Sequence, residues 1–236
     1  MKLAKGLFVT ATGTDVGKTY VTALLLKKLN EENFSCGYYK AALSGAENIT
    51  ESDAGYVKSI AKLNQDDDTL LSYLYKTAVS PHLASQIEGN PVNMGVVKRD
   101  FEKVTNLYDH VLVEGSGGII CPIRYDGKEK IMLEDIVKSL NLSTIVIADA
   151  KLGTINSTVL TVSYLKSKKI AVNGIIMNNY EDGVMEKDNI KMIEELCQIP
   201  VIAKVKPNST DIDISADEIC RLFKEIWIWI IYNKEI

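Results

Sequence analysis

The sequence lacks paired cysteines and any histidine pair with metal-binding spacing. Its four cysteines lie far apart, and no two of them form a CxxC pair: Cys36, Cys121, Cys197 and Cys220. This distribution argues against a zinc site and against the disulfide framework of a secreted protein. The two histidines, His82 and His110, sit in different segments without metal-like spacing. We therefore expect a reducing, cytoplasmic location.

The sequence also lacks a basic stripe and a membrane-length apolar run, and we do not expect its first residues to act as a signal peptide. With 27 Lys and Arg against 31 Asp and Glu, the net charge is -4, so we expect neither a nucleic acid nor a membrane as partner. A small anionic ligand stays possible. "MKLAKGLFVTATG" has no long apolar stretch before its polar loop, and "IWIWIIY" supplies only about a third of the roughly 20 residues that span a bilayer.

What the sequence does contain is an alternation of short β-branched runs with helical patterns. Strands are expected at 6–11, 36–42, 110–115, 143–150, 172–178 and 200–205. Helices are expected at about 18–32, 53–63, 81–89, 93–106, 132–140, 156–168, 186–197 and 215–230. This order predicts the α/β class, with a mostly parallel sheet flanked by helices on both faces. At 236 residues and 46% apolar, the chain 1–236 is expected to form one domain.

The stretch "TGTDVGKT" (12–19) lies between the first expected strand and the first expected helix. Gly17, Lys18 and Thr19 supply the end of a phosphate-binding P-loop, in which backbone N–H groups, a lysine and a hydroxyl surround a nucleotide triphosphate and Mg²⁺. Thr12 occupies the place of the first glycine of the general pattern, with Gly13 after it. A plain turn is the alternative interpretation.

Polar residues follow three later strands, at the edge where ligands bind in such sheets. Lys40 ends the second strand, and Asp53 opens a helix after it; a solvated lysine and a helix cap are the alternatives. Glu114 ends an apolar strand and is followed by the glycine-rich "GSGG". A carboxylate there would face the P-loop, where a ligand of Mg²⁺ is required. The glycines could instead form only a tight turn.

The segment "KLGTIN" (151–156) places a glycine and small polar residues at the start of a helix. Free N–H groups and the positive end of the helix dipole suit a carboxylate or a phosphate. Ordinary capping by Thr154 or Asn156 is the alternative.

Taken in order, these segments resemble the dethiobiotin synthetase family, ATP-dependent enzymes of biotin synthesis, to about residue 210. The matching pieces are "FVTATGTDVGKT", "YYKAALSG" with "SDA", "SPHLAS" with "EGNPV", "LVEGSGG", "AKLGTIN" and "IIMNN". Such a series is far more specific than a P-loop alone. The first loop departs from the family pattern at Ala11, Gly13 and Asp15.

The tail from about 215 to 236 has no counterpart in this resemblance. Its helix-like stretch with Trp227 and Trp229 is expected to cover the sheet. An added oligomer contact is the alternative, because exposed aromatic patches often mark interfaces.

The resemblance implies conversion of 7,8-diaminopelargonate (7,8-diaminononanoate), CO₂ and ATP to dethiobiotin, ADP and phosphate. The implied route is formation of a carbamate on one amine, its phosphorylation to a carbamic-phosphoric anhydride, and ring closure by the second amine. Because carbamate and triphosphate are both anionic, their approach needs cations and Mg²⁺ more than a general base. The resemblance further implies a homodimer with the active site at its interface.

The resemblance also implies a role for each matching residue. The implied ATP-binding residues are Gly13, Thr14, Asp15, Val16, Gly17, Lys18, Thr19, Tyr20, Asn178, Val205 and Pro207. Implied ligands of Mg²⁺ are Thr19, Asp53 and Glu114. The implied catalytic residues are Lys18, Lys40, Thr14 and Ser44. The diamine is assigned to Lys40, Ser44, Gly117 and Gly118, and its carboxylate to Gly153, Thr154, Ile155 and Asn156 of the partner subunit.

Three rival classes fit the sheet but fit the motifs less well. A switch ATPase of the partition or septum-positioning type normally carries an early lysine in its P-loop, where this sequence has Thr12 to Thr14. A guanine-nucleotide switch needs an Asn-Lys-x-Asp base reader, and "NNYED" is not one. A nonenzymatic flavodoxin-like module would give no reason for the convergence of four charged residues, Lys18, Lys40, Asp53 and Glu114.

Overall fold

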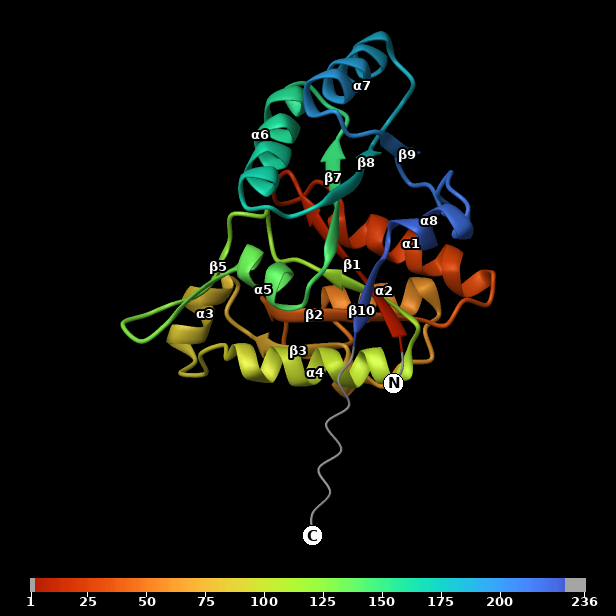
Figure 1. Ribbon diagram of the computed structural model, residues 1–236. Coiled ribbons are helices and arrows are strands. Elements are labelled where there is room, and N and C mark those ends of the chain that lie inside the picture. The colour runs from red at the N-terminus through yellow and green to blue at the C-terminus, as the bar shows by residue number, and fades with distance from the viewer. Residues whose placement is uncertain (1–2, 228–236) are drawn as a thin grey trace.

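The computed structural model describes residues 3–227, which are built around one mostly parallel sheet (Figure 1). Hydrogen-bonded strands follow the order β3-β2-β4-β1-β7-β8-β9, and β10 pairs with β1 off this path. The strands are β1 (Leu3–Ala11), β2 (Cys36–Ser44), β3 (Leu71–Tyr75), β4 (His110–Glu114), β7 (Ser143–Asp149), β8 (Val172–Asn178), β9 (Val201–Val205) and β10 (Lys224–Trp227). Neighbours along the path are parallel, and β10 runs antiparallel to β1. The predicted fold class is confirmed.

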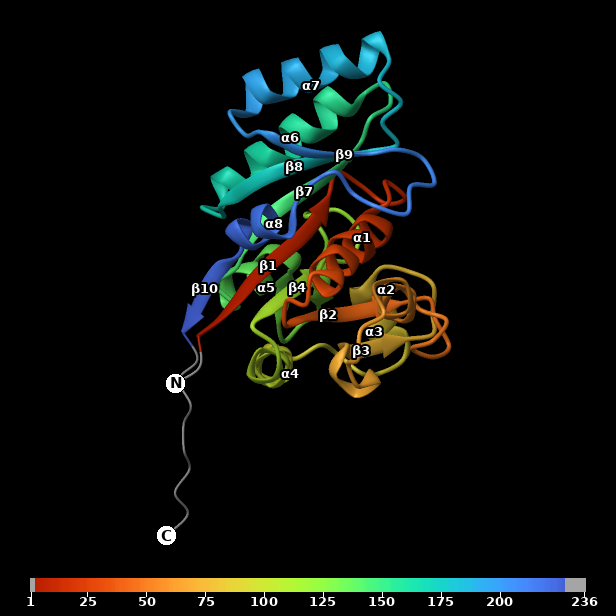
Figure 2. The same cartoon turned by 90° about the vertical axis from the view of Figure 1, so that its right-hand side faces the viewer.

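Helices pack on both faces of the sheet, as expected (Figure 2). On one face lie α1 (Lys18–Glu31), α2 (Asp53–Ala61) and α8 (Ala216–Leu222). The other face carries α3 (Pro81–Ile87), α4 (Met94–Leu107), α5 (Leu133–Ser139), α6 (Thr154–Ser167) and α7 (Val184–Cys197). A short 3₁₀ turn, η1 (Asp67–Thr69), precedes β3.

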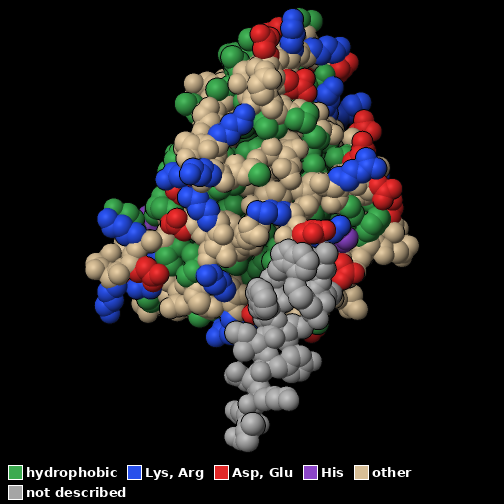
Figure 3. Space-filling model, in the orientation of Figure 1, with side chains coloured by type: hydrophobic (Ala, Val, Ile, Leu, Met, Phe, Trp, Pro, Cys, Tyr) green, Lys and Arg blue, Asp and Glu red, His purple; other side chains and the backbone are tan. Residues whose placement is uncertain are grey.

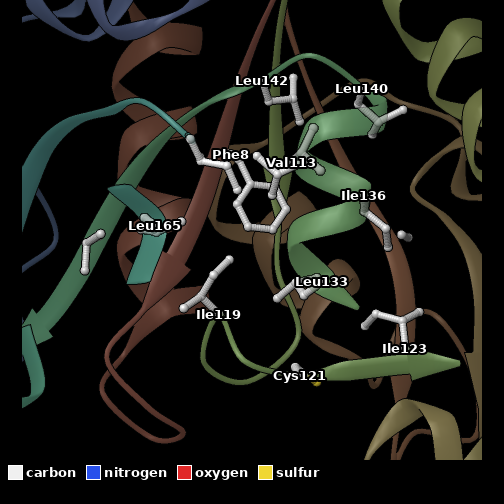
Figure 4. Close-up of a cluster of buried hydrophobic side chains, with 14 of the residues drawn as sticks. Phe8, Val113, Ile119, Cys121, Ile123, Leu133, Ile136, Leu140, Leu142 and Leu165 are labelled. Atoms are coloured by element: carbon white, nitrogen blue, oxygen red, sulfur yellow. The ribbon is translucent and has the colours of Figure 1, made fainter. Parts of the chain in front are cut away.

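Strand β1 lies in the middle of the sheet and is buried on both faces, which explains its continuous apolar sequence. Leu7 and Val9 pack with α1 on one side, while Phe8 points to the other. Figure 4 shows the Phe8 ring among the side chains of its cluster, with Ile119 and Leu133 beside it. Because β1 is held by these two cores, the loop that follows it starts from a fixed point.

Apart from the last helix, the predicted strands and helices appear within a few residues of their expected ends. The sequence analysis missed β10, which replaces part of that helix, and three further strands. Strand β3 lies at the sheet edge next to β2. The strands β5 (Pro122–Tyr125) and β6 (Lys130–Met132) form a separate antiparallel hairpin. All three are short, so they gave little periodicity from which to predict them.

The predicted helix at 215–230 is wrong in its second half. Helix α8 ends at Leu222, and the chain continues as β10. The reason is tertiary: β7 joins β1 only from Leu7 onward, so the start of β1 keeps a free edge, and residues 224–227 pair with it. Trp227 and Trp229 were expected to cover the sheet. The described structure includes neither of these side chains, so that expectation stays a prediction.

The surface carries charges of both signs. Figure 3 shows Lys and Arg interspersed with Asp and Glu on the visible face. Within residues 3–227, no helix is both long and apolar enough to cross a membrane.

Replacing Phe8 tests the core that fixes β1. Phe8 is 1% exposed, and we expect Phe8→Ala to lower the free energy of unfolding by about 3–5 kcal/mol because it leaves a cavity. Urea unfolding measures the change. Leu196→Ala on α7, where Leu196 is 54% exposed, should change it by no more than about 0.5 kcal/mol. Equal effects of the two substitutions would contradict this account of the core.

Candidate active site

The loop after β1 has the conformation of a phosphate-binding turn. Gly17 has φ +85°, and a Cβ there would lie 2.0 Å from Asn178 Nδ2. Position 17 therefore requires glycine for two independent reasons. Helix α1 begins directly after it and has no side-chain cap, so its first N–H groups point into the loop without such a partner. Asp15 also has positive φ, which Asp tolerates better than most residues.

Glu114 is the centre of the polar cluster at the end of β4. Its side chain is fully buried, and its Oε1 accepts hydrogen bonds from three donors on two other elements. Lys40 Nζ lies at 2.8 Å, Thr19 Oγ1 at 3.0 Å and Lys18 Nζ at 3.4 Å. The parallel register brings them together, because Lys40 on β2 pairs directly with Glu114.

The charges in this cluster depend on one another. Burial alone would raise the pKa of Glu114, but the charges of Lys40 and Lys18, with hydrogen bonds from Lys40 and Thr19, lower that pKa to about 2. Burial by itself would lower the pKa of Lys40. The negative charges and hydrogen bonds of Glu114 and Asp53 have a larger opposite effect, so the pKa of Lys40 is raised. Burial dominates at Lys18 and lowers its pKa despite Glu114. Glu114 is thus held as an anion and Lys40 as a cation.

Lys40 connects the two predicted carboxylate ligands. Its Nζ lies 2.6 Å from Asp53 Oδ2, while its side chain is only 3% exposed. The alternative of a solvated lysine is therefore wrong. The alternative of Asp53 as helix cap is also wrong, since Ser52 is the N-cap of α2 and accepts from the Gly55 N–H.

A cavity of about 860 Å³ opens in front of this cluster. Predicted site residues that line it are Gly13, Thr14, Asp15, Gly17, Lys18, Thr19, Tyr20, Lys40, Ser44, Asp53, Gly117 and Gly118. The wall of the glycine-rich loop is fixed by Ser116, which donates to the Ala42 carbonyl at 2.6 Å. Ser44 donates to the Val79 carbonyl at 2.5 Å, so a ligand must compete for its hydroxyl.

The glycines after Glu114 have separate physical roles. Gly117 has φ +64°, and a Cβ there would meet nothing within 4 Å. Gly118 lies near the P-loop, with its Cβ position 3.5 Å from the Ala11 carbonyl. At Gly115, by contrast, a Cβ would lie 2.9 Å from the Phe8 ring. Gly115 is thus required for core packing, and the other two leave the cavity wall open.

The polar cluster fits a cation that shares its ligands with a bound phosphate. Glu114 Oε2 is buried without a hydrogen-bond partner, Asp53 is half-exposed, and Thr19 adds a hydroxyl. Among the described residues, no three His, Cys, Asp or Glu gather to hold a metal by themselves. Two carboxylates with further ligands from phosphate and water match the preference of Mg²⁺.

The residues assigned to adenine lie beside the P-loop. Asn178 and Val205 are register partners at the ends of β8 and β9. Asn178 Nδ2 donates to the Val16 carbonyl at 3.0 Å, whereas its Oδ1 is buried without a partner. The Tyr20 hydroxyl donates to the Ser209 carbonyl, two residues beyond the exposed Pro207. Asn178 thus ties β8 to the P-loop, and Tyr20 ties α1 to the segment after β9. The three residues assigned to adenine are not among those that line the cavity in front of Glu114.

The start of α6 lies outside this cavity. Gly153 is its N-cap with φ +93°, and no side chain caps the helix. Capping by Thr154 or Asn156 is therefore wrong, and the first N–H groups lack a side-chain acceptor. Thr154 is buried, Ile155 is half-buried, and Asn156 is exposed. In this single chain the four residues from Gly153 to Asn156 do not reach the Glu114 cluster.

The sequence analysis missed several residues of the cavity wall, among them Tyr56 and Cys121. Tyr56 lies one helical turn after Asp53 on α2, a spacing that could have indicated it. Cys121 lies after the glycine-rich loop, where no local signal marks it. Burial raises the pKa of its thiol to about 11, so it stays protonated near neutrality and is a poor nucleophile.

Comparison with known proteins gives close relatives over almost the whole chain. A family model described as an AAA domain matches residues 5–213. A protein of Brachyspira hyodysenteriae named ATP-dependent dethiobiotin synthetase BioD is 54% identical over 86% of this chain and 92% of its own. A protein of the same name from Clostridium botulinum is 50% identical over 95% of this chain and 100% of its own.

Solved structures resemble the fold at low sequence identity. The MinC:MinD cell division protein complex of Aquifex aeolicus matches with a TM-score of 0.54 and 15% identity, over 86% of this chain and 81% of that chain. A ParA family ATPase from Chlorobium tepidum matches with a TM-score of 0.55 and 12% identity, over 87% and 85%. At such identity the likeness concerns the fold alone, so it does not favour the switch-ATPase alternative.

Replacing Glu114 tests the charge cluster. Glu114→Gln leaves two buried ammonium groups without their shared anion, so we expect the free energy of unfolding at neutral pH to fall by about 3 kcal/mol. The folded-state pKa lies below the ordinary value of 4.5, so the stabilisation by ionised Glu114 is complete above pH 4.5 and is lost as the pH falls toward 2. Urea unfolding across this range should show the deficit of the variant shrinking on acidification.

The matched control is Glu31→Gln, since the Glu31 side chain is 53% exposed and pairs only with Lys27 within its own helix. Its effect should be small at every pH. A Glu114→Gln deficit that stayed constant down to pH 3 would contradict the assigned ionisation of Glu114.

Proposed function

The chain belongs to the ATP-dependent dethiobiotin synthetase family, and from this premise we infer that it converts 7,8-diaminopelargonate, CO₂ and ATP to dethiobiotin, ADP and phosphate. One amine of the diamine adds to CO₂ and loses a proton, giving a carbamate. A carbamate oxygen takes the γ-phosphoryl group as ADP leaves, and the second amine then attacks the carbamate carbon and releases phosphate. The observation that carries this proposal is the convergence of Lys18, Thr19 and Lys40 on buried Glu114.

The P-loop is proposed to hold the triphosphate. Free N–H groups at the start of α1 and the positive end of its dipole favour the phosphate oxygens. Lys18 reaches the cavity from the first position of that helix, where its ammonium would neutralise the β- and γ-phosphates. The residues from Gly13 to Tyr20 other than Val16 line the surrounding wall, and the Val16 carbonyl accepts a hydrogen bond from Asn178 Nδ2.

Thr19, Asp53 and Glu114 are the proposed holders of Mg²⁺. When bound, the ion would neutralise charge on the phosphates during transfer. Glu114 suits this role because its neighbours keep it ionised. Asp53 suits it because its half-exposed carboxylate can turn toward a ligand in the cavity.

Lys40 is proposed to bind the carbamate, with Ser44 and Thr14 beside it. Its ammonium is held charged by Glu114 and Asp53, so it offers positive charge exactly where two anionic reactants must approach each other. Ser44 and Thr14 line the same cavity and can donate hydroxyl hydrogen bonds. Gly117 and Gly118 leave room for the chain of the diamine. This arrangement stabilises charge and orients reactants, which is what the reaction requires.

The carboxylate of the diamine is assigned to the start of α6 in a second copy of the chain. Gly153, Thr154, Ile155 and Asn156 offer an uncapped helix terminus suited to an anion. A homodimer would bring this terminus to the cavity of its neighbour. Exposed apolar side chains support such an interface: Leu152 is 87% exposed beside the terminus, and Ile120 is 64% exposed at the cavity.

Adenine is assigned to the end of the loop formed by Asn178, Val205 and Pro207. The unpartnered Asn178 Oδ1 can accept a hydrogen bond from the 6-amino group of the base. Val205 is buried beside it, and Pro207 follows on the exposed loop. Tyr20 and Ser209 tie this loop to α1.

The remaining parts of the proposal concern the chain as a whole. We treat residues 1–236 as one synthetase domain that works in the cytoplasm on small molecules, without nucleic acid or membrane. The mixed charge of the sequence supports this assignment.

Phosphate release from Mg·ATP tests the reaction. We expect release by the purified protein to require both bicarbonate and 7,8-diaminopelargonate and to yield dethiobiotin by mass. Lys18→Ala should abolish nucleotide binding and turnover because the phosphates lose their buried cation. Hydrolysis independent of the diamine would indicate a switch ATPase instead, and near-normal turnover by Lys18→Ala would refute the phosphate assignment.

Charge at the start of α6 tests the carboxylate site. Asn156→Asp should raise the KM for the diamine by about threefold to tenfold, because a like charge about 4 Å away in a water-filled site costs roughly 1 kcal/mol. Ser163→Asp adds the same charge to an exposed position two turns along the same helix and should leave KM unchanged. Steady-state kinetics at saturating ATP compare the two variants. If Asn156→Asp kept the wild-type KM, this terminus would not face the substrate.

A further inference from the structure

Two buried polar atoms in the Glu114 cluster lack hydrogen-bond partners among the described residues: the Tyr38 hydroxyl and Glu114 Oε2. Tyr38 is 0% exposed and Glu114 is 1% exposed, so bulk water does not reach them. Leaving such groups unpaired costs about 1–3 kcal/mol each, and more for a charged one. Each atom could supply what the other needs, since a phenol donates and a carboxylate accepts.

The register of the sheet places Tyr38 next to Glu114. Tyr38 precedes Lys40 by two residues on β2, so both side chains point to the same face. Tyr38 pairs with Leu112 on β4, and Lys40 pairs with Glu114. Burial first, and then the charge and hydrogen bonding of Glu114, raise the pKa of Tyr38 well above its ordinary value. By register, the side chains of Tyr38 and Glu114 lie on the same face of two paired strands.

We propose that Tyr38 is a positioning residue, whose hydroxyl donates to Glu114 Oε2 and fixes the rotation of the carboxylate. Oε1 already receives Lys18, Thr19 and Lys40, whereas Oε2 has nothing else to hold it in the described structure. A fixed carboxylate presents its oxygens to the cation at a constant angle. The inference rests on the proposed function, because it takes Glu114 as a ligand of Mg²⁺.

A residue that orients a metal-binding side chain has a measurable effect on metal binding. Loss of a group that orients a metal-binding side chain typically lowers metal affinity or activity by about 10–100-fold. We expect the lower end of this range for Tyr38→Phe, since three donors still hold Oε1. The substitution keeps the shape of the ring and opens no cavity, but it leaves the buried Oε2 without its donor, so we expect the urea midpoint to fall as well.

Tyr39 provides a matched control on the same strand. It is also 0% exposed but points to the opposite face, where its hydroxyl donates to the Val97 carbonyl at 3.0 Å and shares a hydrogen bond with Ser72 Oγ at 2.6 Å. Tyr39→Phe therefore removes a buried hydroxyl with good partners, away from the cluster. It should also lower the urea midpoint, but it should leave metal affinity unchanged, so the metal affinity separates it from Tyr38→Phe.

The experiment measures Mn²⁺ affinity by electron paramagnetic resonance, with a nonhydrolysable ATP analogue at saturation, for the wild type and both variants of the full chain. Urea unfolding of the same samples reports stability. We expect about tenfold weaker Mn²⁺ binding for Tyr38→Phe and less than a twofold change for Tyr39→Phe. The Mg²⁺ concentration for half-maximal product formation should shift in parallel.

The possible results separate the inference from the proposed function. Equal Mn²⁺ affinity in the wild type and Tyr38→Phe would overturn the role of Tyr38 and leave the proposed function intact. Equal weakening by both variants would also overturn it, because the effect would then come from the core in general. A wild type that binds no Mn²⁺ with the analogue would overturn the proposed function and the inference together.

Discussion

The structure around the site depends on one buried ion pair, between Lys40 and Glu114. Both side chains are nearly inaccessible, and each would be costly to bury alone. The pair is stable because Glu114 receives further donors and Lys40 reaches a second carboxylate, Asp53. The same neighbours that make burial tolerable also hold both groups in their charged forms.

This ion pair connects the core to the chemistry. Glu114 ends β4, and Lys40 lies within the neighbouring parallel strand β2; both strands are anchored by apolar packing on both faces of the sheet. Parallel strands leave their carboxyl ends at one edge, where the P-loop after β1 also lies. The backbone therefore brings cations, carboxylates and free N–H groups into one cavity, and two anionic reactants could approach each other there. The site needs precise placement of charge more than a reactive side chain.

Much of this site could be predicted from the sequence, because the relevant signals are local. Lys18 and Thr19 follow a strand and open a helix, and Glu114 ends an apolar run before glycines; each pattern spans only a few residues. Alternatives for Asp53 and Lys40 stayed open because capping and solvation look alike in a sequence. Lys40 can be buried because it pairs with Glu114, a carboxylate 74 residues away in the sequence. The residues around Lys40 do not indicate this pairing.

The sequence by itself determined the alternation of strands and helices, and hence the parallel sheet and the edge at which ligands bind. Hydrophobic periodicity and turn residues act over short spans, so they can be read without knowing the fold. Only the tertiary structure decided that residues 224–227 form a strand, because the free edge of β1 competes with a weak helical preference. It alone also placed Tyr38 on the same face of the sheet as Glu114, since strand register decides which side chains share a face.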